Sequence, residues 1–147
     1  FVNKPEVTAW YKMAFSRYSV NGVDKMSWVW SWWAFFGGVF YLLYRKAYLP
    51  ALGLFVLTIV SFAIPFGGLI VWIVTGGLAP YFVYQTYKSK KAEIEANIAD
   101  EQKRIETMRA VGGVNDWAIW LAVALHVLMW ISVFTMLSTM MAMFSQQ

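Results

Sequence analysis

The fold is decided by residues 47–87, which read AYLPALGLFVLTIVSFAIPFGGLIVWIVTGGLAPYFVYQTY and contain no Asp, Glu, Lys, Arg or His. The run Pro65-Phe66-Gly67-Gly68 predicts a tight turn near the middle. We therefore expect two apolar helices, residues 47–65 and 67–87, joined as a transmembrane hairpin. Pro80 predicts a kink in the second helix, which is tolerated where a neighbouring segment satisfies the freed backbone.

Two further apolar blocks, residues 28–44 and 117–144, flank this pair, and every charged residue lies outside the four blocks. A helix that faces lipid does not tolerate Lys or Glu on its outer stripe. Charged residues make up 14% of the chain, against about 25% in soluble domains. We therefore predict an all-α integral membrane protein with one membrane domain over residues 1–147, which has four apolar helical segments and three or four full spans.

The first apolar block leaves the number of spans open. As a helix, residues 28–44 measure about 26 Å, short of a hydrocarbon core of about 30 Å, and Gly37-Gly38 lies at their middle. Aromatic residues at both ends favour a full span, whereas charge favours a re-entrant segment that leaves all 12 Lys and Arg residues on the cytoplasmic side. The residues predicted to lie at the membrane interface are Trp28, Trp32, Trp33, Tyr44, Arg45, Lys46, Tyr84, Tyr87 and Lys88.

Polar sequence precedes the first apolar block and separates the third block from the fourth. Residues 1–27 show aromatic residues at helical spacing beside basic ones and predict an amphipathic helix that ends at an Asn21-Gly22 turn. This helix either lies in the membrane interface or packs on protein. Residues 88–111 predict one polar, cytoplasmic helix about 36 Å long, within a segment that covers residues 88–113.

Charge spacing and capping signals add detail to the C-terminal half. In the polar helix we expect ion pairs between Lys91 and Glu95 and between Asp100 and Arg104. The last span lies in residues 114–147, with Asn115 or Asp116 as its cap.

Two apolar stripes predict contacts with other proteins. The polar helix carries a narrow stripe, and the last span carries Met residues on one face beside Ser132, Thr135 and Thr139. The predicted partner-binding residues are Ile94, Ile98, Ile105, Met108, Met129, Met136 and Met140. The expected partners are other integral membrane proteins, a further copy of the chain, and anionic lipid headgroups, whereas no nucleic acid is expected.

The sequence contains few side chains that could catalyse a reaction. The chain has no cysteine and one histidine, His126, and no carboxylate lies within an apolar block. A lone intramembrane histidine suits a neutral imidazole bonded to a backbone carbonyl or a hydroxyl; as a metal or haem ligand, His126 would need Met136, Met140 or another Met. We predict no catalytic residue, no cofactor and no enzymatic activity.

Part of the first block resembles a known family. The runs Trp33-Ala34-Phe35-Phe36-Gly37 and Tyr41-Leu42-Leu43-Tyr44-Arg45-Lys46 are similar to the signature of a family of small bacterial inner-membrane proteins of unknown function, over about residues 28–60. Gly38 stands where that signature has Pro, and Ser31 or Trp32 stands where it has Asn. The resemblance implies a multi-pass protein of the bacterial inner membrane and gives no activity.

These features favour a non-enzymatic accessory or scaffold subunit of a bacterial inner-membrane protein complex. Two alternatives are a homo-oligomeric channel or transporter of an uncharged or lipidic solute, with the Gly pairs and Pro80 as moving parts, and a haem or copper carrier that uses His126 and Met residues.

Overall fold

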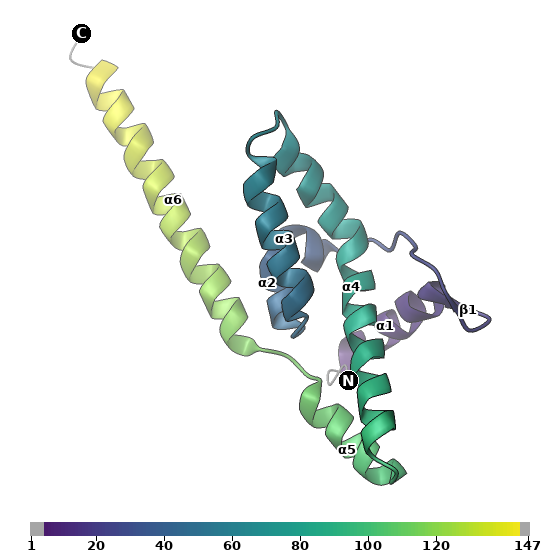
Figure 1. The fold of residues 1–147 in the computed structure, drawn as a ribbon. Coiled ribbons are helices and arrows are strands. Elements are labelled where there is room, and N and C mark those ends of the chain that lie inside the picture. Colours follow the sequence, from purple (N-terminus) through teal and green to yellow (C-terminus); the bar gives the residue numbers. More distant parts are fainter. Residues whose placement is uncertain (1–4, 145–147) are drawn as a thin grey trace.

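The computed structural model describes residues 5–144, which are mostly helical (Figure 1). The described elements are α1 (Pro5–Tyr18), β1 (Ser19–Val20), β2 (Val23–Asp24), α2 (Trp32–Tyr44), α3 (Tyr48–Ser61), α4 (Gly67–Asn97), α5 (Glu101–Val111) and α6 (Asp116–Phe144). This confirms a helical fold. Residues 1–4 and 145–147 of the first and last predicted segments lie outside the described residues.

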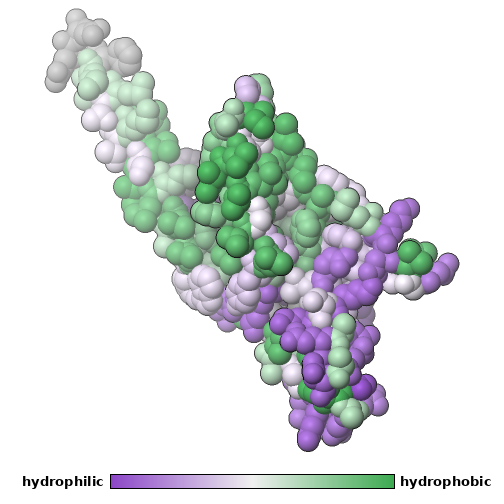
Figure 2. Space-filling view, in the orientation of Figure 1, coloured by the Kyte–Doolittle hydropathy of each residue, from purple (hydrophilic) through white to green (hydrophobic). Residues whose placement is uncertain are grey.

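Two of the described helices, α4 and α6, are long and apolar enough to cross a membrane. By contrast, α2 has 13 residues and α3 has 14, so each measures about 20 Å and falls short of a hydrocarbon core of about 30 Å. The predicted count of three or four full spans is therefore not supported by helix length. Figure 2 shows where the surface changes character: hydrophobic residues cover α3, α6 and the adjoining part of α4, and hydrophilic residues gather around α5.

The N-terminal helix packs on protein. Helix α1 buries Tyr11, Ala14 and Tyr18, and the last two share a cluster with Tyr84 of α4. The predicted Asn21-Gly22 turn is confirmed: both residues have positive φ, 53° and 79°, which fits the two central positions of a two-residue hairpin turn. It joins β1 and β2, which pair antiparallel with Ser19 opposite Asp24 and Val20 opposite Val23.

The start of the first apolar block is extended and docks on α4 one turn before Pro80. Val29 N donates a hydrogen bond to Gly77 O (3.1 Å), and Ser31 N donates to Gly76 O (2.8 Å). Pro80 lacks an N–H group, so the carbonyl four residues before it, that of Gly76, has no donor within the helix. The extended segment supplies that donor, which confirms the expectation that a neighbour satisfies the freed backbone.

Glycine makes this contact possible. A Cβ atom at Gly77 would lie 2.2 Å from Cε2 of Trp28, and one at Gly76 would lie 2.9 Å from Cη2 of Trp30. Two indole rings therefore cover the glycine pair, and any side chain there would push the extended segment away from the carbonyls it bonds.

Helix α2 is not a straight span, because the chain bends back at its middle. Gly38 has φ 51° and ψ −126°, which breaks the helix. Before the break, Phe35 stacks on Trp72 in the N-terminal half of α4, with ring centroids 5.3 Å apart. After it, Tyr41 and Leu42 share a buried cluster with Ala79 and Val83, and also with Ala47 and Ala51 at the start of α3. Residues 28–44 thus run along α4 and return.

The polar segment is not one helix. Helix α4 continues through Lys88 to Asn97, and α5 begins after a break, so the prediction of one continuous helix over residues 88–111 is wrong. The predicted pair of Lys91 with Glu95 is confirmed (3.7 Å), but Asp100 and Arg104 do not pair. Asp100 caps α5 by accepting from Gln102 N (2.9 Å), and Arg104 donates to Ile98 O and Glu95 O at the end of α4.

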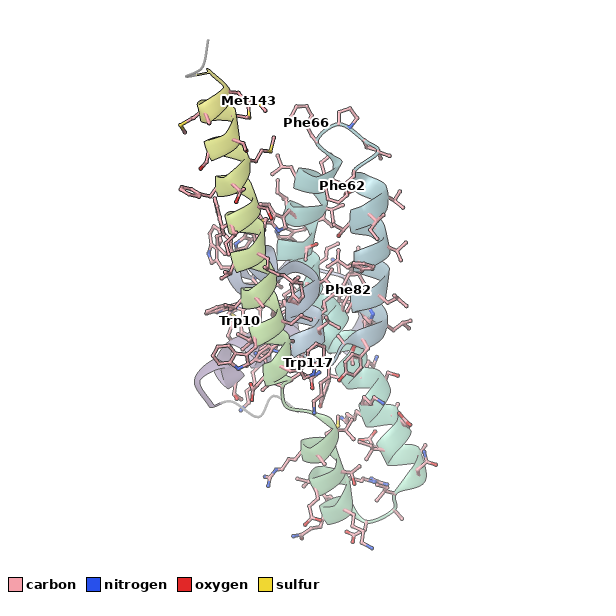
Figure 3. The ribbon with its side chains drawn as sticks, turned by 90° about the vertical axis from the view of Figure 1, so that its left-hand side faces the viewer. Trp10, Phe62, Phe66, Phe82, Trp117 and Met143 are labelled. Carbon is pink, nitrogen blue, oxygen red and sulfur yellow. The ribbon has the colours of Figure 1, made fainter. Side chains whose placement is uncertain are left out.

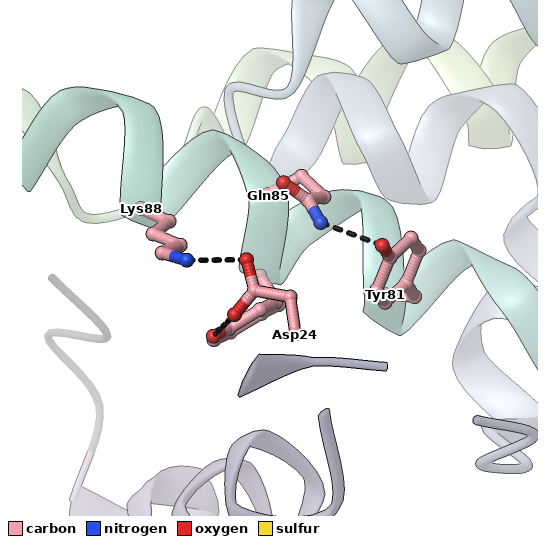
Figure 4. Close-up of polar contacts among 5 residues, drawn as sticks. Asp24, Tyr81, Gln85 and Lys88 are labelled. Atoms are coloured by element: carbon pink, nitrogen blue, oxygen red, sulfur yellow. Dashed lines mark hydrogen bonds and ion pairs between the residues drawn. The ribbon is translucent and has the colours of Figure 1, made fainter. Parts of the chain in front are cut away.

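One carboxylate ties the N-terminal hairpin to α4 (Figure 4). Asp24 forms an ion pair with Lys88 and accepts a hydrogen bond from the Tyr84 hydroxyl (2.8 Å). The hydrogen bond from Lys88, with a smaller contribution from that of Tyr84, holds the pKa of Asp24 below its usual value. One turn away, Gln85 donates to the Tyr81 hydroxyl (2.6 Å).

The glycine contact predicts an unusual cost for a small substitution. Gly77→Ala should lower the stability of the protein by about 1–3 kcal/mol, the range for overpacking a closed contact. Gly53→Ala is the matched control, because a Cβ atom there meets open space and Ala favours the helix by up to about 1 kcal/mol. Thermal unfolding in detergent, followed by circular dichroism, measures both. Equal midpoints for the two variants would contradict the role given to Gly77.

The Asp24 contacts predict an acid-sensitive stability. Because the pKa of Asp24 is lowered on folding, its stabilising contribution is fully present above the ordinary aspartate pKa of about 3.9 and is lost as the pH falls through the lower, folded value. The thermal midpoint of the wild type should therefore fall more steeply between about pH 5 and pH 2.5 than that of Asp24→Asn. Parallel pH profiles would show that Asp24 does not contribute in this way.

Candidate functional site

Three elements meet where α6 begins. Asn115, just before α6, donates through its side chain to Leu43 O (2.9 Å) and the Tyr48 hydroxyl (2.7 Å), and its backbone N donates to Tyr44 O (2.9 Å). Lys46 Nζ donates to Gly112 O (2.6 Å) in the connection from α5. The ends of α2, α3 and α5 thereby fix the base of α6.

A buried cation lies beside this junction. Arg45 follows the last residue of α2 and is only 7% exposed. Its guanidinium carbon lies 4.5 Å from the centroid of the Tyr11 ring and 5.3 Å from that of Tyr44, which are cation–π distances. The Tyr11 hydroxyl lies 2.8 Å from that of Tyr41. Arg45 therefore joins α1 to α2, and its charge complements the negative end of the α2 dipole.

The cation of this cluster forms no ion pair with the acidic residues of the described part of the chain. Burial raises the pKa of Tyr11, against the smaller opposing effect of the Arg45 charge. Nε and Nη1 of Arg45 are buried without a hydrogen-bond partner, and the ion pairs found among residues 5–144 involve neither Arg45 nor Lys46. This end of the helical bundle is therefore electropositive.

An apolar cleft lies between α6 and the other helices. It encloses about 630 Å³ and is bounded by α2, α3, α4 and the first half of α6. Its lining includes Leu43 and Tyr48 near the junction, Phe55 and Trp72 farther along, and Leu125 and His126 of α6. No charged side chain lines it apart from the titratable His126. Such a space suits a hydrocarbon ligand better than a polar one.

Beyond the cleft, α6 stands away from the rest of the described chain (Figures 1 and 3). Its side chains from residue 123 to residue 143 are all exposed. The predicted partner-binding Met129, Met136 and Met140 are 49%, 65% and 44% exposed. Ser132, Thr135 and Thr139 each donate to a carbonyl four residues earlier on α6, so their oxygens retain lone pairs that can accept a bond from a neighbour.

The other predicted docking stripe is divided between two helices. Ile94 of α4 is buried, whereas Ile105 of α5 is 49% exposed, and both line a small cleft of about 250 Å³ with Met108. Ile98 lies at the break between the helices. Three of the four residues therefore line one cleft between the two helices, in place of a stripe along a single helix. Ile105 is the most exposed of the four.

The predicted interface residues separate into two groups. Trp28, Trp32 and Trp33 are 52%, 62% and 80% exposed, as expected for side chains that face lipid headgroups. Arg45 and Tyr84 are buried in the protein. Within the protein, Lys46 is bonded to Gly112 O and Lys88 is paired with Asp24. The remaining two, Tyr44 and Tyr87, are partly buried.

His126 bonds to a backbone carbonyl: Nδ1 lies 2.7 Å from Ala122 O on the same helix. This confirms the predicted backbone partner. Among residues 5–144 no group of three or more His, Cys, Asp or Glu is placed to hold a metal ion. Met136 and Met140 are both exposed on α6, so the haem and copper roles stay predictions.

The junction was not foreseen from the sequence as a site. Asn115 was predicted only as a helix cap, and Tyr48 had no predicted role, because their bonding partners lie more than sixty residues away in the chain. The signal in the sequence was the polar triplet of Tyr44, Arg45 and Lys46 between two apolar blocks, which is also the most specific part of the resemblance described above.

The comparisons with known proteins show a family and give no activity. No curated protein and no protein of known structure shows significant similarity to the chain. A family model described as "Protein of unknown function (DUF2628)" matches residues 1–88, which carry α1, α2, α3 and most of the apolar part of α4. Because that match covers more than half of the 147 residues, the chain belongs to this family of unknown function.

Proposed function

We propose that this protein is a non-enzymatic accessory or scaffold subunit of a bacterial inner-membrane protein complex. The observation that carries the proposal is α6: a 29-residue helix whose side chains beyond the cleft are exposed, although they include a Met face and a row of hydroxyl groups. The bacterial membrane location rests on the resemblance of residues 28–60 and on the two helices long enough to cross a bilayer.

The composition of that surface favours a protein neighbour over lipid alone. Lipid tails need only apolar side chains, whereas Ser and Thr are enriched where membrane helices touch and can bond across the contact. Met is unbranched and polarizable and fills irregular gaps between helices. Met129, Met136 and Met140 lie beside Thr135 and Thr139 along α6. A second copy of this chain would use the same face, which makes a homo-oligomer one outcome of the test.

The proposed topology has the polar end in the cytoplasm and residues 28–44 re-entrant. Support comes from the bend at Gly38 and from the contacts that return Tyr41 and Leu42 to Val83 of α4. All Lys and Arg residues then share one side of the membrane, as the positive-inside rule favours. The exposed Ile105 of α5 would offer the complex a cytoplasmic contact.

A bulky substitution on the Met face tests the proposed role. Met136→Trp should lower recovery of co-purifying membrane proteins by about fivefold to a hundredfold, since overpacking costs about 1–3 kcal/mol and 1.4 kcal/mol is a factor of ten. Leu137→Trp is the control, because the next residue lies about 100° around the helix and is also exposed. The measurement is quantitative mass spectrometry of tagged protein purified in gentle detergent. Equal recovery with both variants, or no partner in fixed ratio with the wild type, would reject the proposal.

Single cysteines test the topology, because the chain has none of its own. With a membrane-impermeant maleimide, Met26→Cys and Lys103→Cys should react only after the membrane is opened, and Met143→Cys should react in intact spheroplasts. Met26 and Met143 are both well exposed. Labelling of Met26→Cys in intact spheroplasts would show instead that residues 28–44 cross the membrane.

A further inference from the structure

Four helices border the apolar cleft beside α6, and no residue among 5–144 fills it. We propose that it binds one acyl chain of an anionic phospholipid, whose headgroup lies at the Lys46 end. This inference rests on the proposed membrane location but not on the accessory role. It is carried by the size of the cleft, the chemistry of its lining and the charge at its end.

The volume of the cleft suits an acyl chain and is too small for a protein helix. The cleft encloses about 630 Å³. A methylene group is similar in size to a water molecule, whose share of liquid volume is about 30 Å³, so the cleft accepts about 20 such groups. That is one fatty-acyl chain. A helix at least 10 Å wide that ran along the roughly 21 Å of α3 would fill about 1,600 Å³, more than twice the available volume.

The lining matches hydrocarbon along most of its length. Phe36, Phe55, Ile59, Phe62 and Trp72 contribute apolar surface from three helices. The two threonines in the lining, Thr58 and Thr75, already donate their hydroxyl groups to Leu54 O and Val71 O of their own helices. His126 uses Nδ1 on Ala122 O. The polar groups of the lining are thus largely satisfied within the protein and do not demand a polar ligand.

Charge selects the headgroup and the direction of binding. At one end of the cleft, Leu43 and Tyr48 are bonded to Asn115 of the polar junction, and Arg45 and Lys46 lie between these two residues in the chain. Lys46 gives one hydrogen bond to Gly112 O, and an ammonium group has three donors, so two remain for a phosphate. The acidic residue next to Asn115 in the sequence is Asp116, at the start of α6. The remaining donors of Lys46 therefore favour an anionic headgroup at this end.

Native mass spectrometry of the purified protein, incubated with equal amounts of phosphatidylglycerol and phosphatidylethanolamine in mild detergent, tests the inference. The wild type should retain one phosphatidylglycerol per chain. Gly68→Leu should reduce retention at least about tenfold, because Gly68 lines the cleft and a Cβ atom there enters open space. Gly53→Leu is the matched control: it adds the same side chain to α3 in open space and outside the lining.

Lysine variants test the headgroup separately. Lys46→Gln should keep the bound lipid but lose the preference for phosphatidylglycerol, and Lys46→Arg should restore it, since both native and restored side chains are cationic. Equal lipid retention in the Gly68→Leu and Gly53→Leu variants would show that the retained lipid lies around the protein and not in the cleft. That result would overturn the proposal. An unchanged preference in Lys46→Gln would overturn the headgroup assignment. Because only purified protein is used, a failed search for protein partners leaves these results intact.

Discussion

Pro80 within α4 is the constraint on which the rest of the structure depends. The proline leaves the Gly76 carbonyl without a donor inside the helix, and Ser31 N supplies one at 2.8 Å. The two glycines let the indole rings of Trp28 and Trp30 lie against the helix backbone. A hydrogen bond of this kind contributes only about 0.5–1.5 kcal/mol net, whereas a buried carbonyl left without a partner costs about 1–3 kcal/mol. The cost of leaving the Gly76 carbonyl without a partner therefore decides where the extended segment docks, more than the net strength of the hydrogen bonds does.

This docking determines what the first apolar block can be. Its first residues are used in extended form, so only 13 residues remain for α2, and Gly38 then breaks that helix. The block runs along α4 and returns to the level of Val83. The residues that follow it reach the base of α6, where Tyr48 is bonded to Asn115 and Lys46 to Gly112 O. The junction in turn directs α6 alongside the bundle at a distance that leaves the apolar cleft. Helix α6 thus contributes one wall of the cleft through Leu125 and His126, and most of the lining comes from α2, α3 and α4.

The family match shows which of these features lie in the region shared with the family, but it does not explain them. The matching region, residues 1–88, contains the docking segment, the hairpin and the cationic pair, whereas α5 and α6 lie outside it. The cleft therefore combines a face built from family residues with a face supplied by α6. The Met face of α6 and the exposed Ile105 also belong to the part beyond the match.

The sequence by itself determined the helical class, the apolar helices of the α3–α4 hairpin, the Asn21-Gly22 turn and the backbone bonding of His126, because these follow from local propensity, hydrophobicity and turn chemistry. Tertiary structure alone decided three other features. The extended docking of residues 28–31 needed a carbonyl on another helix, the burial of Arg45 needed the Tyr11 ring of α1, and the junction needed Asn115 beside Tyr48. The division of the polar segment into α4 and α5 belongs with them, because Arg104 donates to carbonyls across the break. Each of these contacts joins residues whose separation along the chain gives no periodic signal, so no pattern in the sequence could predict it.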